Sequence, residues 1–275
     1  MPWWKFSVLE ATFRGRKIPS FIPLRSSNQA MATLYAFPNT DSLSKSLSDF
    51  VERLSEEAIS ARGHFSVALS GGSLPKLFAA HLKSNPRVDF SRWHIFLADE
   101  RCVPLDDPES NFGLVKKELL DHLTAQPKVY PINPDLVGHP EKAAVDYERR
   151  VREALGENAQ IDLIMLGMGP DGHTCSLFPG HPLLNVSERL IDSLTNSPKP
   201  PPSRITFTYP FVNRGRYVAF VATGEGKQDV LKAILDHKDW ALPSTRVQPE
   251  SGKLFWFVDE PAAKKLDYSR AEYKL

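Results

Sequence analysis

The side chains best suited to proton transfer in this chain lie in a glycine-rich stretch, residues 167–173. Asp171 and His173 are separated by one glycine, and the stretch follows an apolar run at residues 161–166 that predicts a buried parallel strand. Imidazole titrates nearest to neutral pH, so His173 can take a proton from water without strong tuning. Asp171 is close enough in sequence to orient the ring. The alternative is a histidine that only closes a turn through a backbone hydrogen bond.

The setting of this histidine favours a functional role. Gly167, Gly169 and Gly172 let the backbone approach a ligand closely and adopt positive φ angles. In an open α/β sheet, ligands bind beyond the carboxyl ends of the strands, which is where this stretch is expected to lie.

A second strand end carries a turn of small residues. Ser70, Gly71, Gly72 and Ser73 connect an apolar run at residues 65–69 to an expected helix at residues 74–82. Free N–H groups and the positive end of the helix dipole make such a turn a phosphate site. The turn matches neither a Walker loop nor the dinucleotide fingerprint. The alternative is a turn that simply connects a strand to a helix.

Two further strand ends carry charge. Asp99, Glu100 and Arg101 follow an expected strand at residues 93–98, and Arg101 is suited to bind a phosphate or polarise a carbonyl group. Lys227 opens an expected helix after a strand at residues 217–222. A lysine there opposes the helix dipole unless an anion joins it, which indicates a phosphate ligand. A structural ion-pair cluster is the alternative for the first group.

Residues 204–209 alternate in polarity, so Arg204 and Thr206 share one face of an expected strand. They are either polar groups on the cleft side or the solvent face of a half-exposed strand. The preceding residues 197–203 are rich in proline and predict a stiff extended segment.

Strand and helix patterns alternate along the chain, which predicts a parallel sheet covered on both faces. Thr40 or Asp41 is expected to cap the first helix. The remaining strands are expected at residues 33–37, 129–132 and 254–258, and the remaining helices at 41–61, 110–123 and 140–155.

The glycine-rich stretch closely resembles a known signature. Residues 167–179, Gly-Met-Gly-Pro-Asp-Gly-His-Thr-Cys-Ser-Leu-Phe-Pro, are similar to the motif of the 6-phosphogluconolactonases, the sugar-phosphate lactonases of the pentose phosphate pathway. The segments at 70–73, 99–101 and 223–227 resemble the same family. The resemblance spans roughly residues 33–260 and implies a modified Rossmann-type three-layer α/β sandwich with a mainly parallel sheet. Ribose-phosphate isomerase and glucosamine-6-phosphate deaminase share this fold.

The resemblance implies hydrolysis of 6-phospho-D-glucono-1,5-lactone without a metal or organic cofactor. His173 would be the general base and acid, with Asp171, Arg101 and Asp99 as the other catalytic candidates. The candidates for holding the phosphate are Ser70, Gly71, Gly72, Ser73, Arg204 and Lys227.

Two other functions stay open on the sequence. Sugar-phosphate isomerases and deaminases of the same superfamily also carry an Asp-Gly-His loop, but the deaminases place a Glu five residues beyond the histidine, where this chain has Phe178. A non-catalytic sugar-phosphate sensor would keep the phosphate groups and would not need His173.

Composition limits the partners of the chain. The formal net charge is +1, which does not indicate a nucleic-acid or anionic membrane surface. No apolar run approaches the ~20 residues of a membrane span. Two cysteines, Cys102 and Cys175, fit a reducing compartment better than a disulfide scaffold. We expect a cytoplasmic enzyme for a small sugar-phosphate lactone, either a monomer or a weak homo-oligomer.

Residues 1–30 differ from the rest, with five basic side chains against one acidic. They are either an organelle-targeting peptide or a disordered extension, and prolines at 19 and 23 interrupt any long amphipathic helix. Residues 31–275 are expected to form a single catalytic domain.

Overall fold

The computed structural model describes residues 12–13, 16–17 and 32–274 of the chain. The chain divides into two units, residues 1–30 and 31–275. In the first unit, β1 (Thr12–Phe13) pairs antiparallel with β2 (Arg16–Lys17). Most of the predicted targeting or disordered extension lies outside the described residues.

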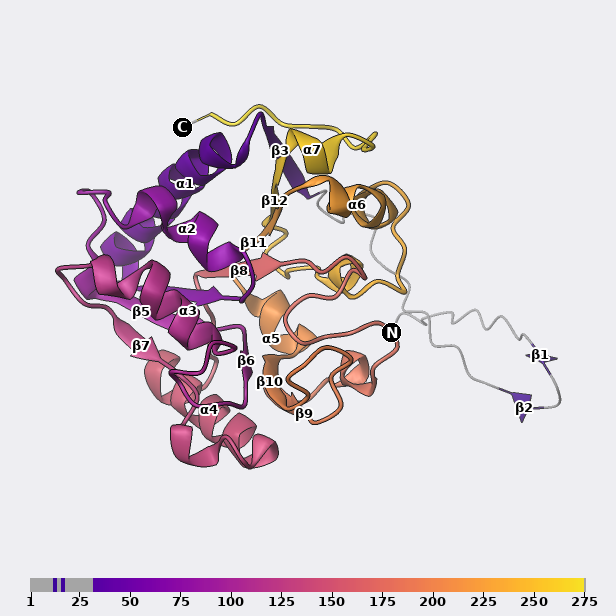
Figure 1. Cartoon of the computed structure of the whole chain (residues 1–275), viewed down its shortest axis with the longest axis horizontal. Helices are drawn as coiled ribbons and strands as arrows, with labels where there is room; N and C mark the ends of the chain where they lie inside the picture. Colours follow the sequence, from indigo (N-terminus) through magenta and orange to yellow (C-terminus); the bar gives the residue numbers. More distant parts are fainter. Residues whose placement is uncertain (1–11, 14–15, 18–31, 275) are drawn as a thin grey trace, which may run out of the picture. The chain divides into compact units, whose positions relative to one another are not determined.

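The second unit is built on a seven-stranded sheet in which every pair of neighbouring strands is parallel. The order is β3-β12-β11-β8-β4-β5-β7, so the chain repeatedly crosses over between strands (Figure 1). The strands are β3 (Thr33–Phe37), β4 (Phe65–Leu69), β5 (Trp93–Leu97), β7 (Lys128–Tyr130), β8 (Leu163–Gly167), β11 (Tyr217–Ala222) and β12 (Leu254–Asp259).

Helices cover both faces of this sheet because its strands are apolar on both sides. In β8, Leu163 and Met165 pack into one core cluster, while Ile164 and Leu166 pack into the other. The first cluster includes side chains of α1 (Thr40–Arg62), α2 (Leu74–Leu82) and α3 (Asn111–Glu118), which gather on one side in Figure 1. The second includes α4 (Pro140–Leu155), α5 (Tyr209–Arg214), α6 (Gln228–Leu235) and α7 (Glu260–Ala263). The predicted three-layer α/β sandwich is confirmed.

A small antiparallel sheet lies apart from the main one, in the order β6-β10-β9. Its strands are β6 (Asp99–Arg101), β9 (Ile191–Leu194) and β10 (Arg204–Phe207). Arg204 pairs with Arg101 and Thr206 with Asp99, so two predicted site segments are neighbours. All four residues of β10 are buried, which rules out the half-exposed strand.

Several element ends differ from the sequence prediction. Asn39, rather than Thr40 or Asp41, caps α1 by accepting a hydrogen bond from the Ser42 N–H at 2.9 Å. The helix after Ser110 ends at Glu118 and is followed by a 3₁₀ turn. The 3₁₀ turns are η1 (Phe90–Arg92), η2 (Leu120–His122), η3 (Pro134–Leu136), η4 (Pro182–Asn185), η5 (Glu225–Lys227) and η6 (Pro243–Arg246).

Within the described residues, no helix has the length and apolar character needed to cross a bilayer.

Candidate active site

The loop that follows β8 is folded tightly by its own backbone. The Gly169 N–H donates to the His173 carbonyl at 2.9 Å, and the Gly172 N–H donates to the Gly169 carbonyl at 3.0 Å. Gly169 has no substitute here, because an added Cβ would lie 2.0 Å from His173 Nδ1. Gly172 has a φ of +74°, a backbone angle that other residues rarely adopt. The glycines therefore bring His173 back over the start of the loop.

His173 and Asp171 form the predicted pair. Asp171 Oδ1 lies 2.5 Å from His173 Nδ1. An ionised carboxylate can only accept, so Nδ1 carries the proton and the lone pair is on Nε2. The ring packs against Phe178 with centroids 4.8 Å apart. The imidazole is therefore oriented on one edge by a charge and on one face by an aromatic ring.

Electrostatics keep this pair in the form that accepts a proton. Burial lowers the pKa of His173, Asp171 opposes that shift, and Lys199 lowers the pKa further. Burial would raise the pKa of Asp171, but hydrogen bonds and charge from His173 and Lys199 lower it to about 2. At neutral pH the site therefore holds a neutral imidazole beside an ionised carboxylate.

Lys199 is a site residue that the sequence reasoning missed. Its Nζ lies 3.2 Å from Asp171 Oδ1 and 3.1 Å from His173 Nδ1. It comes from the proline-rich segment at residues 197–202, which we call the proline strap. A lysine held between prolines in a stiff segment was the available signal, because such a segment can place one side chain firmly.

The predicted phosphate turn lies beside this loop. A Cβ added at Gly167 would lie 3.8 Å from the Gly71 carbonyl oxygen. A Cβ at Gly71 itself would lie 1.9 Å from Asn111 Oδ1, so only glycine fits there. Gly72 has a φ of +72° and, like Ser73, is exposed. The helix that follows, α2, has no side-chain cap at its start, which leaves its first N–H groups to face a ligand.

Lys227 reaches the same loop from the other side. Its Nζ donates to the Met168 carbonyl at 2.6 Å. Burial lowers the pKa of Lys227, and the charge of Lys199 lowers it further. The loop at residues 167–173 thus lies beside the turn, is bonded to Lys227, and carries His173. The structure brings these three predicted features together.

The sequence and fold are similar to those of known proteins. A family model described as glucosamine-6-phosphate isomerases/6-phosphogluconolactonase matches residues 38–256. The chain belongs to this family.

Its similarity to 6-phosphogluconolactonases is extensive. The rat 6-phosphogluconolactonase is 44% identical over 245 residues, which cover 86% of this chain and 95% of the rat protein. The human 6-phosphogluconolactonase is 47% identical over 214 residues, which cover 75% of this chain and 82% of the human protein. The crystal structure of 6-phosphogluconolactonase from Thermotoga maritima is 31% identical, covers 83% of this chain and 99% of that one, and has a TM-score of 0.73. The resemblance predicted from the sequence is confirmed.

A monomeric glucosamine-6-phosphate deaminase shares the fold, with a TM-score of 0.70 at 16% identity, over 85% of this chain and all of that one. The family description itself names both isomerases and a lactonase, so the fold alone does not decide between these chemistries.

The three consecutive charged residues 99–101 have different surroundings in this chain. Asp99 accepts a hydrogen bond from the Ser176 hydroxyl at 2.9 Å, and its charge helps to raise the pKa of His173 against burial. Glu100 is buried at the start of α3, where the N–H groups of Arg101, Asn111 and Phe112 donate to it. Burial raises the pKa of Glu100 to about 7, although these donors oppose the shift.

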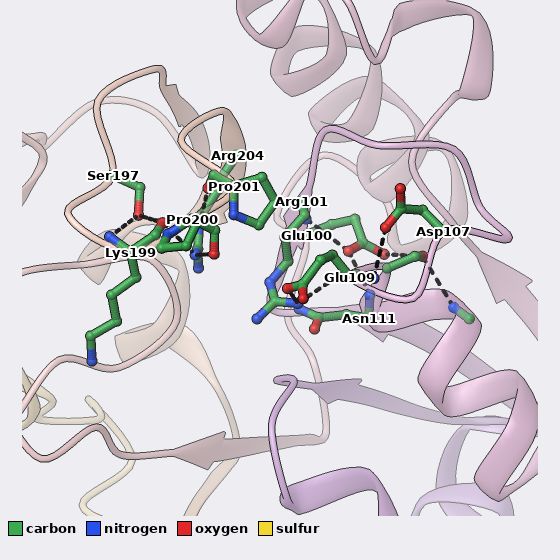
Figure 2. Close-up of polar contacts among 12 residues, drawn as sticks. Glu100, Arg101, Asp107, Glu109, Asn111, Ser197, Lys199, Pro200, Pro201 and Arg204 are labelled. Carbon is green, nitrogen blue, oxygen red and sulfur yellow. Dashed lines mark hydrogen bonds and ion pairs between the residues drawn. The ribbon is translucent and has the colours of Figure 1, made fainter.

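Arg101 is held by Glu109, as Figure 2 shows. Its Nη1 donates to the Glu109 carbonyl oxygen at 2.5 Å and lies 3.5 Å from Glu109 Oε2. The side chain is 21% exposed, so it keeps access to solvent. Its predicted contact with an oxyanion or phosphate stays a prediction.

Arg204 uses its donors on the proline strap. Nη2 donates to the carbonyls of Lys199 and Pro200 at 2.9 and 3.0 Å, and Nε donates to the Pro201 carbonyl at 3.0 Å (Figure 2). Nη1 lies 3.4 Å from the Ser176 hydroxyl. The phosphate contact predicted for Arg204 also stays a prediction, and these bonds leave it little donor capacity for that role.

A second histidine close in sequence, His181, has other partners. Its Nδ1 accepts from the Leu183 N–H at 3.2 Å, and its Nε2 lies 3.0 Å from Asn196 Oδ1. Among the described residues, no group of three or more His, Cys, Asp or Glu side chains is placed to hold a metal ion.

Proposed function

We propose that this chain hydrolyses 6-phospho-D-glucono-1,5-lactone to 6-phospho-D-gluconate. The observation that carries the proposal is the Asp171/His173 pair on a loop that is bonded to Lys227 and lies beside the turn at residues 70–73. The named relatives that are 6-phosphogluconolactonases support the same reaction.

The first step is attack of water on the lactone carbonyl carbon. His173 Nε2 takes a proton from the water as the C–O bond forms, and Asp171 stabilises the imidazolium. The lowered pKa of His173 keeps the ring ready to accept that proton at neutral pH. Arg101, with loop N–H groups, stabilises the oxyanion, as oxyanion holes do in acyl transfer.

The second step breaks the bond between the carbonyl carbon and the ring oxygen. The imidazolium of His173 returns its proton to that ring oxygen, which leaves as the sugar hydroxyl. The product is a carboxylic acid that ionises at neutral pH, so each turnover releases one proton. Asp99 supports the imidazolium through its charge.

Binding of the phosphate group positions the lactone ring of the substrate next to His173. Gly71, Gly72 and Ser73 offer backbone N–H groups at the start of α2, and Lys227 offers a cation. Ser70 would contribute through its hydroxyl group, because its N–H donates to the Met165 carbonyl at 3.1 Å. Fixing the remote phosphate positions the lactone carbon and lowers the entropic part of the barrier. We place Arg204 outside this phosphate site.

Phe178 argues against the deaminase chemistry of the superfamily. It occupies the position where the deaminases carry a supporting Glu, and its ring packs against His173 at 4.8 Å. A phenyl ring cannot relay a proton, so Asp171 is the carboxylate in direct contact with His173 among the residues that the structure describes.

Rates with freshly made lactone test the proposal. Proton release at near-neutral pH should exceed the spontaneous background, and His173→Ala should reduce turnover by about 100-fold or more. Affinity for 6-phosphogluconate should change little. His122→Ala, at an exposed histidine of η2, is the matched control and should behave as the unmodified chain. A wild-type rate equal to the background would leave a sugar-phosphate sensor as the function.

We also propose that the chain works in the cytoplasm as a monomer or weak homo-oligomer, unless residues 1–30 direct it to an organelle. Two rice relatives are named as chloroplastic forms, each 40% identical over 250 residues. Fusing residues 1–30 to a fluorescent protein tests the targeting: a diffuse cytoplasmic signal supports cytoplasmic function, and an organellar signal overturns it.

A further inference from the structure

The carbonyl groups of the proline strap bind it to Arg204, whereas the N–H groups of Ser197 and Lys199 make bonds within the strap itself. Proline has no N–H, so a proline-rich segment cannot pair as a strand does and its carbonyls need donors from elsewhere. Arg204 supplies them, with bonds of 2.9–3.0 Å to the carbonyls of Lys199, Pro200 and Pro201. The Ser197 hydroxyl adds a bond of 2.7 Å to the Lys199 carbonyl. The backbone of Lys199 is therefore held by two side chains.

Arg204 is well suited to hold the strap firmly. The residue is only 4% exposed, and a buried guanidinium that lacks partners is costly. It also lies 5.7 Å from the centroid of the Phe178 ring, which packs on His173. One buried side chain thus links the strap to the aromatic wall behind the imidazole.

The strap places the Lys199 ammonium on the Asp171/His173 pair. Figure 2 shows the Lys199 side chain extending away from the strap. Its Nζ lies 3.2 Å from Asp171 Oδ1, which is a salt bridge, and 3.1 Å from His173 Nδ1. Because that nitrogen already donates to Asp171, the second contact brings two positively polarised groups together. A protonated His173 would face a full positive charge at this distance.

We propose that Lys199 is a positioning residue that, held by Arg204 through the proline strap, keeps Asp171 ionised and His173 unprotonated. The inference deepens the proposed function, because it rests on His173 acting as the base. Of the charged groups in the described part of the chain, Asp171 and Asp99 favour protonation of His173, and Lys199 opposes it. The charges of Lys199 and Asp171 act in turn on Lys227, where Lys199 lowers the pKa and Asp171 raises it.

Lys199→Met tests the inference through two readouts. Removing the ammonium should move the acid limb of the pH profile of kcat/KM upward by about 0.5–1 pH unit. The imidazole titration of His173, followed by NMR and assigned by its loss in His173→Gln, should move upward by the same amount. Lys45→Met, at an exposed lysine of α1, removes the same net charge and should move neither.

Arg204→Lys tests the role of the strap. Lysine keeps the charge but cannot bond to three carbonyls in a fixed fork. The His173 titration should move upward by less than in Lys199→Met, while the melting temperature reports any general loss of folding. If the folded Arg204→Lys protein shows an unchanged pKa of His173, Arg204 is not needed to hold Lys199 in place.

The readouts separate this inference from the proposed function. If Lys199→Met raises the pKa of His173 but neither the wild type nor any variant hydrolyses the lactone, the proposed reaction is wrong. The inference that Lys199 controls the protonation of His173 would still stand. If the wild type is a lactonase and Lys199→Met leaves both the titration and the pH profile unmoved, the inference fails. Weakening of 6-phosphogluconate binding by tenfold or more, with an unmoved titration, would make Lys199 a substrate ligand instead.

Discussion

Strand β8 carries an aspartate at each end, and the two differ in how completely their partners surround them. Asp162 precedes the strand and is 4% exposed. Its Oδ2 accepts from both the N–H and the hydroxyl of Ser66, and its Oδ1 contacts Arg62 at 2.6 Å and Arg216 at 3.3 Å. Both of its oxygens are therefore engaged by groups that stay protonated at any ordinary pH.

Asp171 follows the strand, and its side chain is 36% exposed. It also has two basic partners, but one of them is an imidazole, which can gain and lose a proton near neutral pH. A charged cluster at a strand end is thus no sign of catalysis by itself. The difference lies in a titratable partner, access to solvent and a glycine-rich backbone around it.

Substitution of each aspartate by asparagine should give opposite results, with the largest effect at Asp171. An asparagine there can donate to Nδ1 and force the proton onto Nε2, which removes the base. We expect Asp171→Asn to lower kcat by about 100-fold or more. The free energy of unfolding should fall by only about 1 kcal/mol, because the bonds of Asp171 to His173 and Lys199 are partly exposed to solvent. Lactone kinetics and chemical denaturation measure the two quantities. A variant with normal turnover would exclude Asp171 from the reaction.

Asp162→Asn should reverse this pattern. It weakens bonds to two arginines and leaves a buried cluster incompletely paired, so we expect a loss of about 2–4 kcal/mol in the free energy of unfolding. For a unit of this size, that loss corresponds to a fall in Tm of roughly 5–15 °C. Turnover of the folded protein should stay near that of the wild type. A large loss of turnover without a loss of stability would contradict the structural role.

Substitutions of one cation at each end of strand β11 should also differ in their effects on ligand affinity and on Tm. Lys227→Met is expected to weaken 6-phosphogluconate binding by about 10–100-fold, because it removes a charged partner of the phosphate. Arg216→Met, at the other end of the same strands, should leave that affinity unchanged and lower the Tm slightly. Isothermal calorimetry compares both with the wild type. Equal affinities in all three proteins would move the phosphate site elsewhere.

Lowering the pH should reduce both the stability of the protein and its kcat/KM, because His173 becomes protonated. The folded pKa of His173 lies below the ordinary 6.5, so its stabilising contribution is complete above pH 6.5 and is lost as the pH falls toward the folded pKa. For the same reason, kcat/KM should stay level down to pH 6.5 and fall below it. In His173→Gln, the part of the stability loss that begins below pH 6.5 should diminish. A kcat/KM profile that falls already above pH 6.5 would contradict the lowered pKa.

Much of the fold could be predicted from the sequence because the apolar runs are local signals. Helices α2 and α4 begin and end where the pattern places them. The α1 cap was wrong by one or two residues, because Asn39, Thr40 and Asp41 are all good capping residues and only the backbone geometry chooses among them.

The candidate site was predictable where its residues are close in sequence, as Asp171 and His173 are. Lys199 was missed because it is 26 residues from His173, and a contact of that kind depends on where Arg204 holds the strap. Arg204 itself was expected near the site, but a basic residue on a strand shows nothing of which acceptors it will meet. The roles of Asp99, Arg101 and the phosphate turn stay predictions.

A crystal structure with bound 6-phosphogluconate would test the central claim most directly, because it reports both ends of the ligand at once. We predict the phosphate on the N–H groups of residues 71–73 and Lys227 Nζ, with the carboxylate about 2.6–3.2 Å from His173 Nε2 or joined to it by one water. A phosphate bound away from both the turn and Lys227, or a carboxylate out of reach of His173, would contradict the account.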